Sequence, residues 1–344
     1  MSAAPTRSRF PWHAIVIAIL TIGLLWLFFR NVDIAEAWRA VTHAHVGYIT
    51  AAVGVMFVVY SLRAQRWLIL LRPLGPVRWS TAFRTTVIGF TVIFLLPGRL
   101  GEILRPYLLA RREGLNAAST FATVIVERLL DVVTVSLLFA GAVLLSGLDV
   151  GERVKVAGIV AAAGSATALA ILCVLAGHPE RLGKFAGRLS RRLPAKVADA
   201  VARIVQRFTE GLVVLRSPGR LAIAGIWSVA VWVTIGLSIW LTSRAFDLTL
   251  SAIGTFIVVG YLAVGVSVPT PGGVGGFEVL YKEAVTTFFG ANPDVGAAAA
   301  LVLHAVSFVP VTIFGLVLMW REGLTLGGLK SMREEAKAAE QPTV

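Results

Sequence analysis

The stretch PGRLGEILRPYLLARREG, residues 97–114, follows directly on the apolar segment 80–96, STAFRTTVIGFTVIFLL. A helix needs about 20 apolar residues to cross the hydrocarbon core of a bilayer. The apolar segment is shorter than that and ends abruptly at Pro97 and Gly98. We therefore interpret the whole region as a re-entrant hairpin, in which 80–96 enters the membrane, Pro97 and Gly98 turn the chain, and 100–109 returns.

A second glycine-rich motif, SVPTPGGVGGFE at 267–278, lies between the apolar runs 251–269 and 276–289. The two motifs are similar, since PGRLGE and PGGVGGFE both place glycines after Pro-Gly and end on a glutamate. This similarity predicts a second hairpin. The alternative is that both motifs are ordinary breaks between full helices.

The remainder of the sequence predicts membrane-spanning helices. Of its 344 residues, 57% are hydrophobic and 15% are charged, and the mean hydropathy is +0.80. Soluble domains have about 45–50% apolar and about 25% charged residues, so a soluble enzyme is excluded. The predicted spans are 12–29, 46–62, 118–146, 154–177, 221–243 and 295–320.

The distribution of Lys and Arg orients these spans, because short cytoplasmic connections are rich in both. The basic N-terminus, the acid-free connection 63–84 and the basic segment 178–220 are expected inside the cell, whereas 30–45 and 146–153, which carry acids, are expected outside. The arginines of the acid-free connection are Arg63, Arg66, Arg72, Arg78 and Arg84.

The hairpin interpretation also keeps Arg105, Arg111 and Arg112 on the cytoplasmic side. It gives each half of the chain the order span, span, hairpin, span, with the second half starting from the opposite side. The sequence thus predicts an all-α, polytopic helix bundle with two re-entrant hairpins and probable inverted repeats. We expect one transmembrane domain over 1–344, with repeat-like halves at about 12–146 and 154–320, a tail at 321–344, and both termini in the cytoplasm of a cell with a bacterial-type (inner) membrane.

The segment 178–220 is predicted to contain a basic amphipathic helix on the cytoplasmic interface. Val197, Val201, Phe208 and Leu212 fall on one helical face, and basic residues lie elsewhere. Anchoring is the favoured role. The net charge of +13 is concentrated in such connections, so we expect contact with anionic lipid and not with nucleic acid.

Three charged residues fall inside the predicted span 118–146, in the run TVIVERLLDVVTV. A charge at the centre of a membrane helix costs about 2.5–3.5 kcal/mol on insertion scales. Glu127, Arg128 and Asp131 should therefore face the protein interior, where Arg128 can pair with Asp131. They indicate either a polar translocation path or an ion-pair network that fixes this helix to a hairpin.

The tips of both hairpins supply the remaining candidate residues. Arg99, Glu102 and Arg105 are spaced three apart and would share one helical face. Free amides at a helix N-terminus and arginine side chains both suit phosphate. The alternative role for this motif is to cap and orient a helix near the cytoplasmic surface.

In the second tip, the candidates are Gly272, Gly273, Gly275 and Glu278, and Glu278 can pair with Lys282 one turn later. The glycine pattern lacks the preceding strand and the G-K-[ST] of a nucleotide-binding loop. The sequence shows no catalytic triad or metal-ligand set, Cys173 is its single cysteine, and we expect no catalytic residues, metal or cofactor. His304 is predicted to be a packed, hydrogen-bonded histidine.

Three motifs together, LLPGRLGEILRPYLLARREG, ERLLD and PTPGGVGGFE, resemble the lysylphosphatidylglycerol synthase transmembrane-region family. The same family includes the flippase domain of the multiple peptide resistance factor. The resemblance extends from about residue 12 to 322 and implies lipid handling at the candidate residues above. The larger relatives carry an aminoacyl-transferase domain after the membrane part, and this sequence reaches Val344 soon after its last span. Only the flippase-like half is therefore expected here.

The favoured hypothesis is a flippase or scramblase-like carrier, not an enzyme, for an anionic phospholipid or a polyprenyl-phosphate-linked lipid. Membrane lipids are the expected partners. The alternatives are a membrane-embedded transferase or its accessory subunit, and a scaffold that recruits a membrane glycosyltransferase or lipid-modifying enzyme through 178–220.

Overall fold

The structure is a computed structural model that describes residues 12–96, 99–177 and 211–324. Its elements in these ranges are helices, and no strand occurs among them, as predicted. In chain order they are α1 (Trp12–Phe29), α2 (Ile34–His43), α3 (Val46–Leu71), α4 (Trp79–Leu95), α5 (Gly101–Glu113), α6 (Ala117–Leu145), α7 (Glu152–Gly177), the 3₁₀ turn η1 (Leu212–Arg216), α10 (Pro218–Ala245), α11 (Thr255–Ser267), the 3₁₀ turn η2 (Pro271–Gly273), α12 (Gly276–Phe289) and α13 (Pro293–Arg321).

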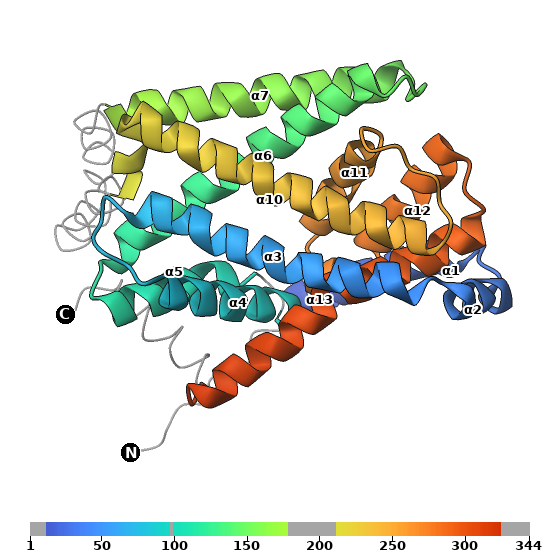
Figure 1. Ribbon diagram of the computed structural model, residues 1–344, viewed down its shortest axis with the longest axis horizontal. Coiled ribbons are helices and arrows are strands. Elements are labelled where there is room, and N and C mark those ends of the chain that lie inside the picture. Colours follow the sequence, from blue (N-terminus) through green and yellow to red (C-terminus); the bar gives the residue numbers. More distant parts are fainter. Residues whose placement is uncertain (1–11, 97–98, 178–210, 325–344) are drawn as a thin grey trace.

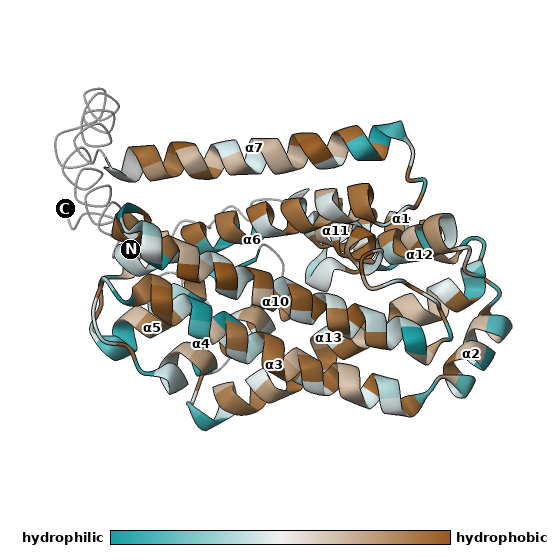
Figure 2. Cartoon of the chain, turned by 45° about the horizontal axis from the view of Figure 1, so that its top comes forward, coloured by the Kyte–Doolittle hydropathy of each residue, from teal (hydrophilic) through white to brown (hydrophobic). Residues whose placement is uncertain are grey.

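Five of the described helices, α3, α6, α7, α10 and α13, are long and apolar enough to cross a membrane. The pair α1 and α2, bent by 81° at the break between them, could form a sixth span. Apolar residues cover the outer surface of the long helices, and polar residues gather in the connections at their ends (Figure 2). A water-soluble protein would bury such surface. The chain is therefore a multi-pass membrane protein.

Helices α3 and α10 pack against each other in antiparallel directions along most of their length (Figure 1). The His45 N–H, just before α3, donates to the carbonyl oxygen of Ala245 at the end of α10 (2.9 Å). About two helical turns further from this end, the Ser238 hydroxyl donates to the Ala52 carbonyl oxygen (3.4 Å). Helix α6 contacts both of them, as does α13. This central pair carries the two short-helix hairpins on its flanks.

The first hairpin consists of α4 and α5, which pack against each other. Gly89 and Gly101 lie at their contact, where a Cβ added to Gly101 would clash with the Gly89 carbonyl oxygen. Helix α5 ends at Gly114, whose φ of 68° is left-handed and suits glycine. The predicted turn residues Pro97 and Gly98 lie outside the described residues.

The second hairpin is α11, η2 and α12, and it is built in the same way. A Cβ on Gly265 of α11 would lie 2.6 Å from the carbonyl oxygen of Gly276, the first residue of α12. Helix α12 ends at Gly290, which is also left-handed, with φ 64°. The two hairpins lie at opposite ends of the molecule (Figure 1). The tips of the two hairpins nevertheless lie against each other, since α4 of the first hairpin contacts η2 of the second.

Side-chain contacts tie the chain connections together at each end of the bundle. At one end, Arg112 in the last turn of α5 forms an ion pair with Glu322 after α13. At the other end, the Asp33 N–H donates to Asp294 Oδ1 at the start of α13 (2.8 Å). Asp33 itself caps α2, and Asn292 caps α13. The direction of α13 is thereby fixed relative to the first hairpin.

One expectation about the connections needs correction, and another lies mostly outside the described residues. The second span was expected to end at 62, but α3 continues to Leu71, because LILL at 68–71 prolongs the apolar helix. Arg63 and Arg66 therefore lie buried within α3, not in a cytoplasmic connection. Most of the predicted amphipathic segment, 178–210, lies outside the described residues; at its end, Leu212 forms part of η1 and is buried.

Candidate functional site

A group of charged side chains lies buried where α3, α5 and α6 meet. It contains four arginines and two carboxylates, and all of these side chains are buried except that of Arg128, which is 33% exposed. We call this group the ionic cluster, and its members are Arg63, Arg66, Arg105, Glu127, Arg128 and Asp131.

Arg66 lies at the centre of the ionic cluster and contacts both carboxylates. Its Nη1 donates to Asp131 Oδ1 (2.6 Å), and its Nη2 lies 3.1 Å from Glu127 Oε1. The same Nη1 also donates to the Ser228 hydroxyl on α10 (2.8 Å). Because charged hydrogen bonds in a dry interior are strong, Arg66 fixes α3 to α6 and α10.

Arg105 connects the first hairpin to the cluster. Its Nη1 donates to Glu127 Oε1 (2.9 Å), and its guanidinium lies 3.8 Å from the centre of the Trp67 ring. The Trp67 indole N–H in turn donates to the Thr123 hydroxyl (2.9 Å). Stacking on an aromatic ring compensates partly for the lost hydration of a guanidinium. The hairpin is thus held against α6 and α3.

Arg63 and Arg128 form the edge of the cluster beside Asp131. Their nearest contacts to Asp131 Oδ2 are 3.6 and 3.5 Å, so the expected pairing of Arg128 with Asp131 is present. The other carboxylate oxygen of Asp131 accepts the indole N–H of Trp232 (3.0 Å). Both guanidiniums lie over the ring of Phe90, at 5.0 and 5.6 Å. Arg128 is the member that reaches toward open space.

The ionic cluster carries an excess of positive charge, since four guanidinium groups face two carboxylates. Guanidinium groups do not lose their proton at physiological pH. Several buried nitrogens have no hydrogen-bond partner, including Arg105 Nε and Nη2 and Arg128 Nε. A buried donor without a partner is costly, and excess positive charge inside a membrane protein favours an anion nearby.

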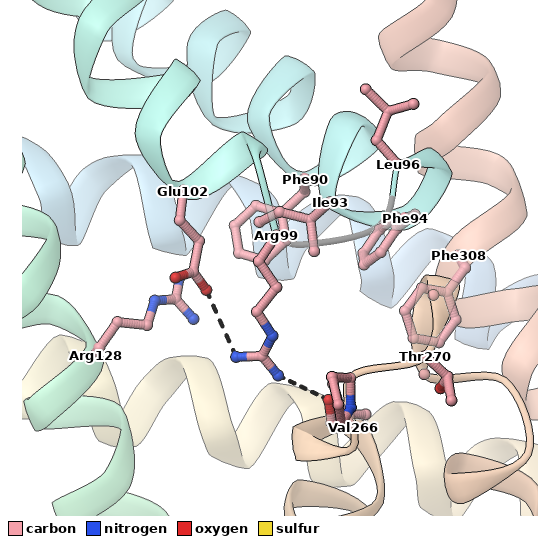
Figure 3. A pocket seen from close by; sticks show the side chains of 13 residues that line it. Phe90, Ile93, Phe94, Leu96, Arg99, Glu102, Arg128, Val266, Thr270 and Phe308 are labelled. Atoms are coloured by element: carbon pink, nitrogen blue, oxygen red, sulfur yellow. Dashed lines mark hydrogen bonds and ion pairs between the residues drawn. The ribbon is translucent and has the colours of Figure 1, made fainter. Parts of the chain in front are cut away.

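A cavity of about 290 Å³ lies next to the cluster, between the tips of the two hairpins (Figure 3). Residues from both hairpins and from α6 and α13 line it. Its lining residues are Phe90, Ile93, Phe94, Leu96, Arg99, Glu102, Arg128, Val266, Pro269, Thr270, Gly272, Gly273 and Phe308. The charged part of this lining comes from the first hairpin and α6, and the remainder is apolar side chains, glycine backbone and the Thr270 hydroxyl.

Arg99 spans this cavity from one tip to the other (Figure 3). Its Nη2 donates to the carbonyl oxygen of Val266 on α11 (2.8 Å), and its Nη1 lies 3.8 Å from Glu102. Arg99 has a φ of 52°, a left-handed conformation that is unfavourable for a residue with a Cβ. Such strain is concentrated at functional sites. The expected helical face of Arg99, Glu102 and Arg105 is not formed, because α5 begins only at Gly101 and Arg99 lies before it. Glu102 lines the cavity, whereas Arg105 belongs to the ionic cluster.

The second tip contributes backbone and a hydroxyl group to the cavity. Gly272 and Gly273 line it in left-handed conformations, with φ values of 62° and 78°. Thr270 is 8% exposed, and its Oγ1 has no hydrogen-bond partner. A polar group of this kind, buried at a cavity wall, is suited to bind a ligand.

Two candidates from the second tip lie outside this cavity. Gly275 packs its backbone against Leu24 of α1, and its N–H donates to Glu278 Oε2 (2.7 Å). The other carboxylate oxygen of Glu278 lies 2.7 Å from His304 Nδ1. The expected pairing of Glu278 with Lys282 is not formed, because the Lys282 ammonium donates to the carbonyl oxygen of Phe28 (2.8 Å).

The structure thus gathers Arg99, Glu102, Arg128, Gly272 and Gly273 around one cavity. The sequence interpretation did not include two arginines of the ionic cluster, Arg63 and Arg66, although their spacing of three along an apolar helix was a usable signal. The aromatic lining residues, such as Phe90 and Phe308, also carried no local sequence signal, since aromatic residues are common in membrane helices.

Long apolar helices, two helical hairpins with glycine contacts and buried charges between them define a polytopic α-helical membrane protein. The sequence profile of the "Lysylphosphatidylglycerol synthase TM region" family matches residues 12–315. The chain belongs to this family, as its three motifs predicted.

Two curated proteins illustrate the relatives. The chain is 26% identical to the "Glycosyltransferase AglD" of Haloferax volcanii, over 90% of this chain and 54% of that protein. It thus spans about half the length of that relative. It is 24% identical to a "UPF0104 membrane protein" of Methanothermobacter thermautotrophicus, over 88% of this chain and 92% of that protein. The similarity to both extends over most of the membrane domain.

Proposed function

We propose that the protein carries an anionic lipid, either a phospholipid or a polyprenyl-phosphate-linked lipid, from one leaflet of the membrane to the other. The observation that supports this most is the cavity between the two broken tips, where Arg99 and Arg128 stand beside apolar and aromatic walls. The two arginines suit a phosphate headgroup, and the apolar walls suit an acyl or prenyl chain.

The headgroup would bind between the two tips. Arg128 is already held by Glu127 and Asp131, so it can present its free edge to a phosphate with little loss of side-chain entropy. The Thr270 hydroxyl and the backbone at Gly272 would complete the site from the second tip. The lipid chain would leave past Phe94 and Phe308, whose rings are 4.4 Å apart and nearly perpendicular.

In the unbound protein, the hydrogen bond from Arg99 to the Val266 carbonyl oxygen would hold the two tips together across the site. A phosphate competes with a carbonyl oxygen for the same guanidinium, and the charged acceptor forms the stronger bond. Binding would therefore free the second tip from the first. Because the hairpins lie at opposite ends of the molecule, movement of one or the other would open the cavity toward opposite membrane faces.

We place the protein in a bacterial-type cytoplasmic (inner) membrane with both termini in the cytoplasm. The end of the bundle formed by the connection α3–α4, the end of α5 and the end of α13 carries Arg72, Arg78, Arg111, Arg112 and Arg321. The opposite end carries acids in or next to several of its connections, namely Asp33, Asp149, Asp247 and Asp294. Positive charge on the cytoplasmic side favours this orientation.

The test reconstitutes purified protein into vesicles that contain fluorescent phosphatidylglycerol, polyprenyl phosphate or phosphatidylcholine, and a membrane-impermeant quencher reports the leaflet of the fluorescent lipid. We expect the anionic lipids to move and Arg99→Gln to slow this movement by about tenfold or more, since a hydrogen bond to a charged group contributes about 1.5–3 kcal/mol. Arg84→Gln, on the exposed side of α4, is the matched control. Failure of the wild-type protein to move either anionic lipid would refute the proposal.

The second candidate function is that of an accessory subunit or scaffold for a membrane glycosyltransferase or lipid-modifying enzyme. The similarity to a protein named a glycosyltransferase, of which this chain spans about half, favours it. Deletion of 178–210 should then abolish co-purification of the partner enzyme and leave lipid movement unchanged. Equal co-purification with and without this segment would argue against the scaffold.

A further inference from the structure

A buried acid on the second hairpin faces a histidine on α13, and the lipid site uses neither of them. Glu278 on α12 is 4% exposed, and its Oε1 lies 2.7 Å from Nδ1 of His304 on α13, whose side chain is 15% exposed. The two atoms are close enough for an ion pair, but they do not form a hydrogen bond. The imidazole ring packs against Phe277 and Phe308, with centroids 5.0 and 4.3 Å away.

This pair occupies the place that Glu102 and Arg128 occupy in the first half. Each hairpin is followed by a left-handed glycine, Gly114 in the first half and Gly290 in the second. Two residues later an asparagine, Asn116 or Asn292, caps the next long helix. Glu102 and Glu278 each lie twelve residues before that glycine. Arg128 and His304 each lie twelve residues after that asparagine. Each half therefore places one acid and one base beside its own tip.

The two corresponding basic residues, Arg128 and His304, differ in whether they can exchange a proton. Arg128 and the other arginines of the ionic cluster remain charged at every physiological pH. Histidine takes up and releases a proton between about pH 5 and 8. Glu278 is a buried carboxylate, and His304 is its one ionic contact within the described part of the chain, so the charge of this pair depends on a single proton.

The pair is coupled to the lipid site through the second tip. Glu278 Oε2 accepts the N–H of Gly275 at the start of α12, and a charged carboxylate is the better acceptor at a helix N-terminus. On the other side, a Cβ at Gly272 would lie 3.9 Å from His304 Nε2, and Phe308 lines the cavity. A change in protonation at the pair is therefore transmitted to the backbone that closes the cavity.

Among the described residues, none of the other titratable groups on the elements around this pair forms an ion pair with Glu278 or His304. On α12, Tyr281 bonds to Ser243, Lys282 bonds to the Phe28 carbonyl oxygen, and Glu283 accepts from Thr287. Those on neighbouring elements include Arg30 after α1, Glu36, Arg39 and His43 on α2, Arg63 and Arg66 on α3, Arg84 on α4, Arg99 across the cavity, Arg244 on α10, Tyr261 on α11, and Asp294 and Arg321 on α13.

We propose that Glu278 and His304 form a proton-binding site that couples proton movement across the membrane to opening of the second hairpin, and hence to lipid transport. This inference rests on the proposed lipid transport. In this step, a proton from the side to which the second hairpin opens binds to the Glu278–His304 pair, and the hydrogen bond from Gly275 N–H to the carboxylate weakens. After the second hairpin has closed and the first has opened, the proton leaves to the opposite side. No covalent bond other than that to the proton changes.

The test imposes a gradient of about one pH unit across vesicles that contain the full-length protein, with the membrane potential clamped. For one proton per lipid, this gradient shifts the steady-state ratio of anionic lipid between the leaflets by about tenfold. We expect the shift with the wild-type protein and its loss in His304→Gln and Glu278→Gln. His45→Gln is the matched control, because His45 also faces an acid, Asp247, but at an exposed position.

Glu278→Gln keeps a side-chain oxygen for the Gly275 N–H, so it tests the proton site even if His304→Gln does not fold. If the wild-type protein moves lipid but gives the same leaflet ratio in both gradient directions, the proton site is refuted and the proposed lipid transport is not. A full gradient response in either folded variant also overturns the proton site. A wild-type protein that moves no lipid in any gradient overturns the proposed transport as well.

Discussion

Replacement of Glu127 by glutamine should destabilise the bundle far more than replacement of a surface glutamate. Glu127 Oε1 is approached by three guanidiniums, with nearest nitrogens at 2.9 Å (Arg105), 3.1 Å (Arg66) and 3.4 Å (Arg128). Glutamine keeps the volume and one acceptor but removes the negative charge. The cluster would then hold four guanidiniums against one carboxylate.

The size of the effect follows from the burial of these groups. Removal of one partner from a buried ion pair costs about 3–5 kcal/mol, because the remaining charges stay buried without compensation. The Glu127 side chain is 0% exposed, so solvent screens very little of this cost. In contrast, the pair of Glu152 with Lys155 is at the surface of α7, and its glutamate is 83% exposed. Glu152→Gln should leave stability unchanged within error.

The assay is equilibrium unfolding of the purified protein in mixed micelles by increasing SDS, with tryptophan fluorescence as the signal. A second variant, Glu127→Gln combined with Arg105→Gln, restores the original net charge of the cluster and should recover part of the lost stability. If Glu127→Gln unfolds at the same SDS fraction as Glu152→Gln, the ionic cluster does not hold the hairpin to α6, and the reasoning is refuted.

Two further substitutions test the packing of the described helices. Gly101→Ala should separate α4 from α5 and lower the free energy of unfolding by about 1–3 kcal/mol, since the added Cβ meets the Gly89 carbonyl oxygen. In the control Gly54→Ala on α3, the added Cβ meets no atom within 4 Å and should not destabilise the protein. Trp232→Phe removes the N–H that donates to Asp131 and should cost about 1.5–3 kcal/mol, with Trp227→Phe on the same helix as the control. Thermal unfolding in detergent measures both pairs, and equal midpoints within either pair would contradict the corresponding contact.

Much of the helical architecture could be predicted from the sequence, because it depends on local patterns. Apolar runs of sufficient length give the long helices, and a short run followed by Pro-Gly gives a break near Pro97 or Pro271. The charged residues of 123–135 were expected to face the protein interior; Glu127 and Asp131 are buried, and Arg128 is partly buried beside them. These features need no knowledge of distant partners.

The composition of the site could be predicted only in part, because it depends on distant contacts. Arg63 and Arg66 near the end of an apolar run fit a cytoplasmic connection equally well, and only the carboxylates of Glu127 and Asp131, more than 60 residues away, make their burial possible. The same holds for His304, whose contact with Glu278 crosses from α13 to α12.

The central claim is that two broken hairpins enter the membrane from opposite faces and meet at an anion-binding cavity. Single cysteines at Arg111, which ends the first hairpin, and at Pro293, which follows the second, test it most directly in a Cys173→Ser background. A membrane-impermeant maleimide should label position 293 in intact cells and position 111 only after the cytoplasmic face is opened. Labelling of both positions from the same face would contradict the claim.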